Sequence, residues 1–421
     1  MPSLDLGPVV GPQGEQGATG AQGIRGEQGL PGPNQVTNST ATPLTGVLTG
    51  NGSVVGVANI DAAPTANSQN LVRSGGIYSA ITVVPPWYEG ADLTQAFADE
   101  ISNYSNPWAW IKARIQAGDF TGIHVNDYIP FTTTDNKSLK ACVGGINTYK
   151  GYGDTAVGNH IDFICRELWP TRKPVNPVNY NNGLIPVETI TGDGTTTTFV
   201  LSKEMNGIAS VTQGGTGLTG YTYDASTFTL TFAEAPAAGS IIVTGTGTEH
   251  PWLASDLYHW LNSLAGQVPN GTGLNPAVKH VDYTQGGVYH YLPAALKAVI
   301  VEKGAYLPKR YSASGLLSDD NAGGWADIGK LWLPSECEVY GAPCWGGKGG
   351  YTTMGNNIQY PIFAHNMNRV KNRSGSRDNW WVLSVCSGTT AGWCRVHSYG
   401  HADYTGASLA TVAAPVCFRI A

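Results

Sequence analysis

Charge is scarce in this chain of 421 residues, and no stretch of it is strongly basic. Charged residues make up 13% of the sequence, against a usual share of about 25%. With 24 Lys and Arg against 30 Asp and Glu, the chain lacks the basic footprint of a nucleic-acid binder. No apolar run approaches the ~18 residues of a membrane helix, and the N-terminal residues lack the features of a signal peptide. The composition predicts no nucleic-acid binding, no membrane insertion and no signal peptide.

The cysteines also lack an obvious pairing pattern. There are seven, with no C-x-x-C pair: Cys142, Cys165, Cys337, Cys344, Cys386, Cys394 and Cys417. An odd number without zinc spacing predicts free, mostly buried thiols made in a reducing compartment. Disulfides that form later, and a metal or redox role, are the alternatives.

Glycine, by contrast, is abundant, with 55 residues. Residues 11–34 read GPQ GEQ GAT GAQ GIR GEQ GLP GPN, eight triplets that each begin with glycine. Only glycine fits the axis where three polyproline-II strands meet, so this strict period predicts that three chains wind together. At about 3 Å per residue the segment would be a rod of roughly 70 Å. A flexible glycine-rich linker is the alternative, but it does not explain the unbroken register.

The next segment, residues 35–86, is rich in Thr, Asn, Ser, Gly and Val and has only two charged residues, Asp61 and Arg73. Short aliphatic stretches between glycines predict intertwined strands rather than helix. The phrases LTGVLTGNGSVVGVANID and APTANSQNLVRSGGIYSAI resemble connectors of phage tail fibres. We therefore expect a β-rich trimeric connector here.

Helix signals begin after Trp87. Asp92 is expected to cap a helix that carries Leu93, Phe97 and Ile101 on one face. A second helix is expected to begin at Asn106-Pro107 and end at Gly118, and a third to begin at Ser255 and end at Gly266.

Residues 184–247 have a different pattern, with apolar and threonine residues alternating around short turns. In YTYDASTFTLTF the inward positions are Phe228, Leu230 and Phe232. Period-2 alternation predicts a small antiparallel β module inserted in the host domain. It resembles the immunoglobulin-like modules of phage fibres, although any small sandwich has the same pattern. A spacer or accessory binding role is expected.

Several phrases of the remaining chain occur in a recognisable order. They are GIHVNDYIPF (122–131), GINTYKGYGD (145–154), HIDFIC (160–165), LWLPSECEVYG (331–341), QYPIF (359–363), WWVLSVCSG (380–388), GWCRVHSYG (392–400) and VAAPVCFRIA (412–421). Together they resemble a phage-associated family with the C-type-lectin-like fold related to formylglycine-generating enzyme. The resemblance implies a compact α+β domain whose C-terminal segment forms an exposed ligand face.

In that family the C-terminal segment resembles the variable regions of diversity-generating retroelements, in which a fixed framework presents interchangeable side chains. The matching framework positions are Trp380, Trp381, Ser384, Trp393, Cys394, Val396, Gly400, Ala402, Ala407, Val412, Pro415 and Cys417. The residues that the resemblance implies to be displayed to a ligand are Ser387, Thr389, Thr390, Arg395, His397, Ser398, Tyr399, His401, Asp403, Tyr404, Thr405 and Ser408. The framework departs from the family at Val382-Leu383-Ser384-Val385, where Leu-Arg-Ser-Pro is usual.

The residues themselves agree with such a face. Residues 380–421 contain three formal charges, Arg395, Asp403 and Arg419, among many aromatic and hydroxyl side chains. Such side chains give contact area and hydrogen bonds at low entropic cost, as in antibody paratopes. Around Val396 the alternation predicts a half-buried strand with Arg395 and His397 outward. An ordinary core strand pair with polar loops is the alternative.

Other site hypotheses are weaker. Trp380 and Trp381 could stack on sugars, but at framework positions a core role is favoured for at least one of them. Asp319-Asp320-Asn321 could bind calcium, although a solvated turn is favoured. His397 and His401, four residues apart, would face each other only on a helix, so a zinc site is not expected. The copper-binding cysteine pair of the enzyme relative is not matched by Cys386 and Cys394, and its catalytic roles are not carried over.

The hypothesis is a phage tail-fibre receptor-binding protein in the virion, without enzymatic activity, that binds a bacterial surface glycan or protein. We expect a homotrimer without a cofactor, attached by its N-terminus to another tail or baseplate protein. A collagen-like bacterial or prophage-encoded adhesin and a fibre-borne polysaccharide-degrading enzyme are the alternatives. The predicted order is an attachment segment (1–10), a collagen-like triple helix (11–34), the connector (35–86), an α+β C-type-lectin-like head (87–183 and 248–421) and the inserted β module (184–247).

Overall fold

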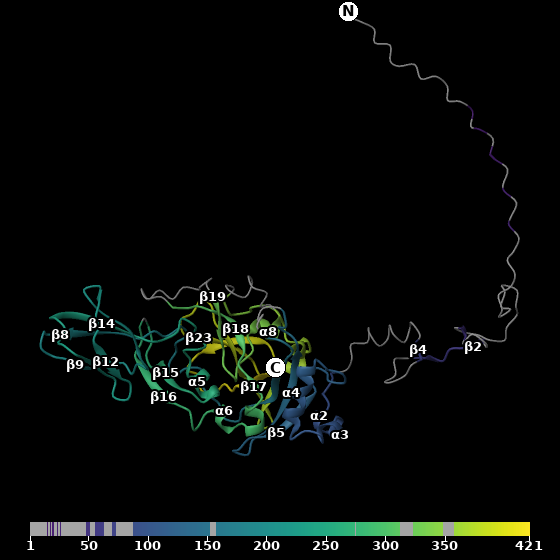
Figure 1. Ribbon diagram of the computed structural model, residues 1–421, viewed down its shortest axis with the longest axis horizontal. Helices are drawn as coiled ribbons and strands as arrows, with labels where there is room; N and C mark the ends of the chain where they lie inside the picture. Colours follow the sequence, from purple (N-terminus) through teal and green to yellow (C-terminus); the bar gives the residue numbers. More distant parts are fainter. Residues whose placement is uncertain are drawn as a thin grey trace, which may run out of the picture. The chain divides into compact units, whose positions relative to one another are not determined.

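The computed structural model divides the chain into two units, residues 1–86 and 87–421, which are described separately (Figure 1). The described residues are 87–151, 157–273, 275–311, 323–347 and 358–421 of the second unit, and 48–50, 55–62, 70–72, Glu15, Gly17, Thr19, Gly20, Gly23 and Gly26 of the first. The attachment segment and most of the collagen-like segment lie outside the described residues. The triple helix therefore stays a prediction.

Four short strands are described in the first unit. β1 (Leu48–Gly50) pairs antiparallel with β2 (Val55–Val57). β3 (Ile60–Asp61) pairs parallel with β4 (Leu71–Val72). These strands lie in the range for which the sequence predicts a β-rich connector, and the trimeric state of that connector stays a prediction.

A seven-stranded sheet forms the centre of the second unit. Its strands are β5 (Tyr128–Thr132), β6 (Ser138–Ile146), β7 (Ile161–Leu168), β17 (Ile300–Val301), β20 (Lys371–Arg373), β21 (Ser376–Asp378) and β25 (Pro415–Ile420). The C-terminal strand β25 pairs antiparallel with β7, and all six of its residues are buried. The end of the chain is thus built into the main core.

Short helices surround this sheet (Figure 1). They are α2 (Leu93–Ala96), α3 (Ala98–Ile101), α4 (Pro107–Ala117), α5 (Asp256–Asn262), α6 (Val288–Tyr291), α7 (Ala294–Lys297), α8 (Glu336–Tyr340), η1 (Pro361–Ala364) and η2 (Asn366–Arg369). None of the helices in the described residues is long and apolar enough to cross a membrane.

The helix predictions are confirmed in part. Asn106 caps α4 by accepting hydrogen bonds from two backbone N–H groups, and Gly118 ends it in the left-handed region, as predicted. The first predicted helix is wrong as a continuous element, because Phe97 leaves helical geometry and packs its ring against Trp110, 5.0 Å between centroids. The third predicted helix begins at Ser255 as expected but ends early, because Ser263 adopts φ 55°.

Residues 187–245 form two antiparallel sheets. One sheet contains β8 (Val187–Gly192), β10 (Ile208–Gln213), β11 (Thr216–Gly217) and β14 (Gly239–Gly245), and the other contains β9 (Thr198–Val200), β12 (Tyr221–Asp224) and β13 (Thr229–Phe232). They share a small core of their own that includes Leu230 and Phe232. The immunoglobulin-like character of this β module stays a prediction.

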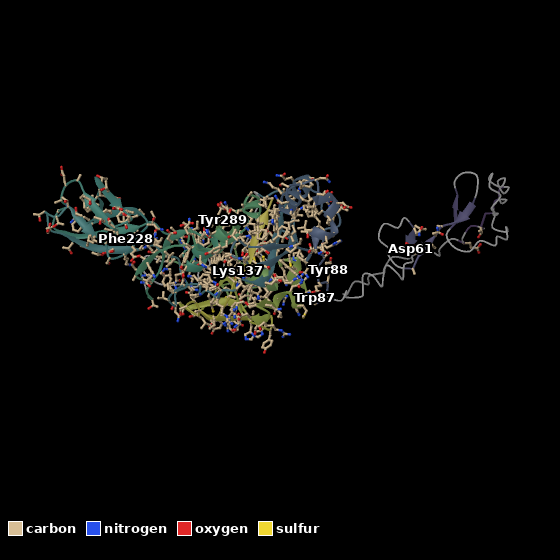
Figure 2. The ribbon with its side chains drawn as sticks, turned by 90° about the horizontal axis from the view of Figure 1, so that it is seen from below. Asp61, Trp87, Tyr88, Lys137, Phe228 and Tyr289 are labelled. Atoms are coloured by element: carbon tan, nitrogen blue, oxygen red, sulfur yellow. The ribbon has the colours of Figure 1, made fainter. Side chains whose placement is uncertain are left out.

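Phe228 does not take the inward position that the sequence predicts. It lies in the turn between β12 and β13 with φ 54°, and its ring lies 6.4 Å from that of His280 outside the module (Figure 2). The two ends of the module meet where the backbones of Leu184 and Thr248 exchange hydrogen bonds of 2.8 and 3.0 Å. The two chain connections of the module therefore lie side by side, and hydrogen bonds from Gln267 and His280 also join the module to β15 and β16.

Three small antiparallel sheets complete the second unit. They are the pair β15 (Ala265–Pro269) and β16 (Val278–Asp282), the pair β18 (Gly304–Pro308) and β19 (Gly323–Asp327), and a three-stranded sheet of β22 (Trp380–Val385), β23 (Gly392–Val396) and β24 (Ala402–Gly406). The described part of the chain is thus rich in β-structure spread over several small sheets. The C-type-lectin-like fold of the head stays a prediction.

Candidate ligand-binding face

The three-stranded sheet of β22, β23 and β24 holds most of the residues that the resemblance implies to be displayed. All six residues of β22 are buried, whereas none of the five residues of β24 is buried. β23 lies between them and pairs with both strands. The sheet therefore passes from the core to the surface, and β24 is its exposed edge.

Ten of the twelve framework residues are buried, and Gly400 and Ala402 are half-buried. The three tryptophans of the framework are fully buried, and each indole N–H donates to a backbone carbonyl: Trp380 to Arg369 at 2.9 Å, Trp381 to Lys173 at 2.8 Å and Trp393 to Val382 at 2.8 Å. Neither Trp380 nor Trp381 can stack on a sugar in this arrangement. Both are core residues, and the hypothesis that they bind a sugar is wrong.

None of the twelve residues expected to be displayed is buried. Four of them are exposed, Thr390, Tyr399, His401 and Tyr404, with 70% for Tyr399 and 42% for Tyr404. They lie in four places: the β22–β23 loop (Ser387, Thr389 and Thr390), β23 (Arg395), the turn that follows it (His397, Ser398, Tyr399 and His401), and β24 with the segment after it (Asp403, Tyr404, Thr405 and Ser408). The structure thus brings all twelve to one sheet, the two loops between its strands and the segment that follows β24.

An ion pair crosses the exposed edge of this sheet. Arg395 and Asp403 are opposite each other in the β23–β24 register, and the guanidinium donates to Asp403 Oδ2 at 2.7 and 3.0 Å. Partial burial alone would raise the pKa of the Asp403 carboxyl, but the hydrogen bonds from Arg395 and from the Tyr404 N–H outweigh it and hold the pKa below its usual value. The two charges neutralise each other, so the face has little net charge.

The turn between β23 and β24 brings His397 and His401 together without a helix. The His397 N–H donates to the His401 carbonyl at 2.9 Å, and Gly400 takes φ 86° in the turn. The imidazole rings stack with their centroids 4.4 Å apart, and the Tyr399 ring lies 5.2 Å from that of His397. The expectation that these histidines would face each other only on a helix is wrong, because a hairpin turn also places residues four apart side by side.

Among the described residues, this histidine pair belongs to no larger group of possible metal ligands. Partial burial lowers the pKa of His397, and the nearby His401 ring lowers it further. In the part of the chain that the structure describes, no group of three or more His, Cys, Asp or Glu side chains could hold a metal ion. The calcium candidate Asp319-Asp320-Asn321 lies outside the described residues.

On the opposite side of β24, Tyr404 contacts a residue that sequence reasoning missed. Successive side chains of a strand point to opposite faces, and the Tyr404 ring lies 4.8 Å from that of Trp345. Trp345 is 43% exposed, and its indole N–H donates to the Ala402 carbonyl at 3.2 Å. The only hint in the sequence is a tryptophan beside a glycine-rich stretch. Trp345 extends the aromatic surface beyond the C-terminal segment.

The loop that carries Trp345 is held by a buried carboxylate. Glu336 accepts hydrogen bonds from the backbone N–H groups of Cys344, Trp345 and Gly346 at 2.7 to 3.2 Å. Burial raises the pKa of Glu336, although these N–H groups act in the opposite direction. The glutamate thus fixes the backbone of the loop that carries Trp345.

Two buried polar residues hold the β22–β23 loop from beneath. Arg310 donates to the carbonyls of Cys386 and Thr389 at 2.8 and 2.7 Å, and Asn181 donates to the Thr389 carbonyl at 2.9 Å. Arg310 is 4% exposed and Asn181 is fully buried. The loop backbone is therefore fixed by the interior, which leaves the Ser387, Thr389 and Thr390 side chains at the surface.

Six of the seven cysteines are buried, and Cys344 alone is exposed. Burial raises the pKa of the Cys394 thiol well above its usual value, and the hydrogen-bonded Cys386 adds to this effect. A thiol with a raised pKa is a poor nucleophile and a poor metal ligand at neutral pH. The cysteines beneath the sheet are thus packing residues.

Comparison with known proteins gives a match for the C-terminal part of the chain. Residues 244–421 match a protein family described as a domain of unknown function, DUF6273. No curated protein and no solved structure matches the chain. The three-stranded sheet, all twelve displayed residues and Trp345 lie within the segment that is similar to this domain of unknown function.

Proposed function

We propose that this chain is a phage tail-fibre receptor-binding protein, a homotrimer of the virion whose head binds a bacterial surface glycan or protein without catalysis. The observation that supports this most is the division within residues 380–417. The framework residues are buried or half-buried, whereas no displayed residue is buried. Such a sheet has a buried framework on one side and an edge strand with polar and aromatic side chains at the surface. This arrangement suits binding to a large ligand.

The chemistry of the face also supports binding rather than catalysis. Tyr399, Tyr404 and Trp345 are exposed aromatic side chains, which give large contact areas at low entropic cost. The one ion pair on the face is internal, between Arg395 and Asp403. Binding through uncharged groups would vary little with salt concentration.

The proposed stem would strengthen such binding. Three heads on one collagen-like rod bind a surface together, so contacts of modest affinity combine through effective concentration. Residues 1–10 would attach the rod to another tail or baseplate protein. A template repeat near the gene that differs from its 3′ end at adenines would show that the face is diversified by a retroelement, and a locus without template and reverse transcriptase would exclude this.

The test is binding of the full-length chain to a panel of bacterial strains. We expect the double variant Tyr399→Ala, Tyr404→Ala to bind a recognised strain at least about tenfold more weakly, since truncating exposed aromatic anchors of an interface costs ~2 kcal/mol or more. The matched control is Tyr104→Ala, because Tyr104 is 38% exposed and follows α3, outside the candidate face. Equal binding by the double variant and the control would reject the proposed face.

A further inference from the structure

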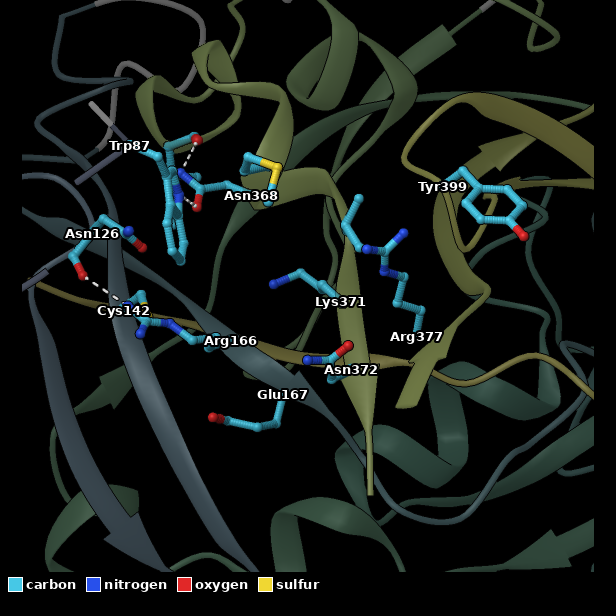
Figure 3. A pocket seen from close by; sticks show the side chains of 13 residues that line it. Trp87, Asn126, Cys142, Arg166, Glu167, Asn368, Lys371, Asn372, Arg377 and Tyr399 are labelled. Atoms are coloured by element: carbon cyan, nitrogen blue, oxygen red, sulfur yellow. Dashed lines mark hydrogen bonds between the residues drawn. The ribbon is translucent and has the colours of Figure 1, made fainter. Parts of the chain in front are cut away.

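A second feature of the head is a cavity of about 440 Å³ in which positive charge predominates. It lies where β7 meets the β20–β21 hairpin and η2, and its walls carry Arg166, Lys371 and Arg377 against a single carboxylate, Glu167 (Figure 3). The chain as a whole has a net charge of −6. The cavity wall is therefore positively charged, although the protein as a whole is negatively charged.

None of these three cations forms an ion pair with a carboxylate among the described residues. Arg166 donates to the backbone carbonyls of Glu89 and Asn126, and Lys371 Nζ donates to the Cys165 carbonyl. Arg377 has no side-chain hydrogen bond or ion pair to the described residues. On the same hairpin, Arg373 does bond to Asp378. Arg377 is exposed, so its guanidinium can bind an anion without giving up an ion pair within the described residues.

Lys371 is the most telling of the three. It is 3% exposed, and its ammonium has one hydrogen-bond acceptor for three N–H donors among the described residues. A buried ammonium is costly unless it is paired, and burial lowers the pKa of Lys371 accordingly. An anion in the cavity would supply the missing acceptors.

The opening of the cavity is aromatic and apolar. Trp87, 37% exposed, is held in place by the hydrogen bond from its indole N–H to Asn368 Oδ1 at 2.8 Å, and Met367 and Tyr399 are 50% and 70% exposed. Figure 3 shows Trp87 and Tyr399 on opposite sides with Lys371 between them. Flat aromatic surfaces suit the apolar face of a sugar ring. The volume lies within the range of about 300–1,000 Å³ that is usual for small-molecule sites.

We propose that this cavity binds an anionic monosaccharide unit, with the sugar ring against Trp87 and the acidic group at Lys371, Arg166 and Arg377. A guanidinium donates paired hydrogen bonds to a carboxylate or to a phosphate with similar geometry. The acidic group of the sugar is therefore a carboxylate or a phosphate. The cavity shares only Tyr399 with the displayed face. The proposal does not rest on the proposed function, because binding of a small sugar to this cavity is measured on the purified protein and does not depend on binding to bacterial cells.

The test is calorimetric titration of the full-length chain with glucuronate, glucose 6-phosphate, glucose and inorganic phosphate. We expect glucuronate or glucose 6-phosphate to bind at least about tenfold more tightly than glucose and than inorganic phosphate. The stronger of the two identifies the acidic group. Equal affinity for glucose, or for inorganic phosphate, would overturn the proposal.

Two variants test whether the acidic sugar binds in this cavity. Arg377→Ala removes an exposed side chain that forms no hydrogen bond or ion pair with the described residues, so we expect a folded protein with about tenfold weaker binding of the acidic sugar. Lys279→Ala, an exposed cation on β16, is the control and should bind as the wild type does. Unchanged binding in Arg377→Ala would overturn the assignment to this cavity.

Discussion

The imidazole rings of His397 and His401 stack across the β23–β24 turn with their centroids 4.4 Å apart. Partial burial and the proximity of His401 lower the pKa of His397 below 6.5. A base whose pKa is lowered by folding stabilises the fold above its unfolded pKa, and this contribution is lost as the pH falls through the folded pKa. We expect the turn to be ordered at neutral pH and to loosen below pH 6.5, with an NMR titration of the His397 ring showing a midpoint below 6.5.

Two variants at this turn serve as controls for the titration of His397. His401→Gln removes the neighbouring ring that can become charged, so the pKa of His397 should move up toward 6.5. Tyr399→Phe keeps the aromatic contact with His397 and changes no charge, so the titration should stay as in the wild type. A wild-type midpoint at or above 6.5 would contradict the described geometry.

The division between framework and displayed residues predicts different effects on stability. Trp381→Ala removes a fully buried indole and its hydrogen bond to Lys173, and should lower the free energy of unfolding by about 3–5 kcal/mol. Tyr399→Ala removes an exposed ring and should change it by less than ~0.5 kcal/mol. Denaturant unfolding of both variants measures this difference, and similar losses would show that Tyr399 is part of the core.

A buried ion pair predicts how the head responds to acid. Arg419 donates to both oxygens of Asp162 at 2.7 and 3.0 Å, and Tyr360 donates to the same carboxylate. Burial alone would raise the pKa of Asp162, but Arg419 outweighs it and lowers the pKa. The stabilisation is thus present above the unfolded pKa and is lost as the pH falls through the folded pKa. Asp162→Asn should cost ~3–5 kcal/mol at neutral pH, because it removes the carboxylate charge that faces the buried Arg419 guanidinium.

The control for this variant is Asp99→Asn, since Asp99 is exposed on α3. Its free energy of unfolding should stay within ~0.5 kcal/mol of the wild type. Thermal or denaturant unfolding at pH 7 compares the two variants, and equal stabilities would show that the Arg419–Asp162 pair has no structural role.

Thiol labelling tests the burial of the cysteines. In the native protein Cys344 alone is exposed, so a thiol reagent should modify one residue per chain at first and all seven after denaturation. Burial raises the pKa of Cys344 as well, so this reaction should be slower than that of a free cysteine. Rapid labelling of Cys386 or Cys394 in the folded protein would contradict their place beneath the three-stranded sheet.

Local features were predictable from the sequence, whereas contacts between distant segments were not. Asn106 and Gly118 mark the ends of α4 because capping depends on neighbouring residues. Ser263 was missed as a helix end because a residue other than glycine rarely takes φ near 55°. The alternation around Val396 was predictable because side chains along a strand alternate with period 2.

The parts of the candidate site that were missed come from other segments. Trp345 contacts Tyr404 only because Glu336 holds its loop beside β24. Arg166 and Lys371 line one cavity because β20 pairs with β7 in parallel. No periodicity or spacing in the sequence reports such pairings. The twelve residues expected to be displayed, in contrast, lie within residues 387–408, and the family resemblance predicts them.

The most direct test of the central claim is photo-crosslinking on a bacterial strain that the full-length chain binds. A photoreactive phenylalanine replaces Tyr404 on the candidate face or, in a matched protein, Tyr104 outside it. We predict that position 404 crosslinks to material of the bacterial surface and that position 104 does not. Crosslinking at position 104 with none at position 404 would contradict the account.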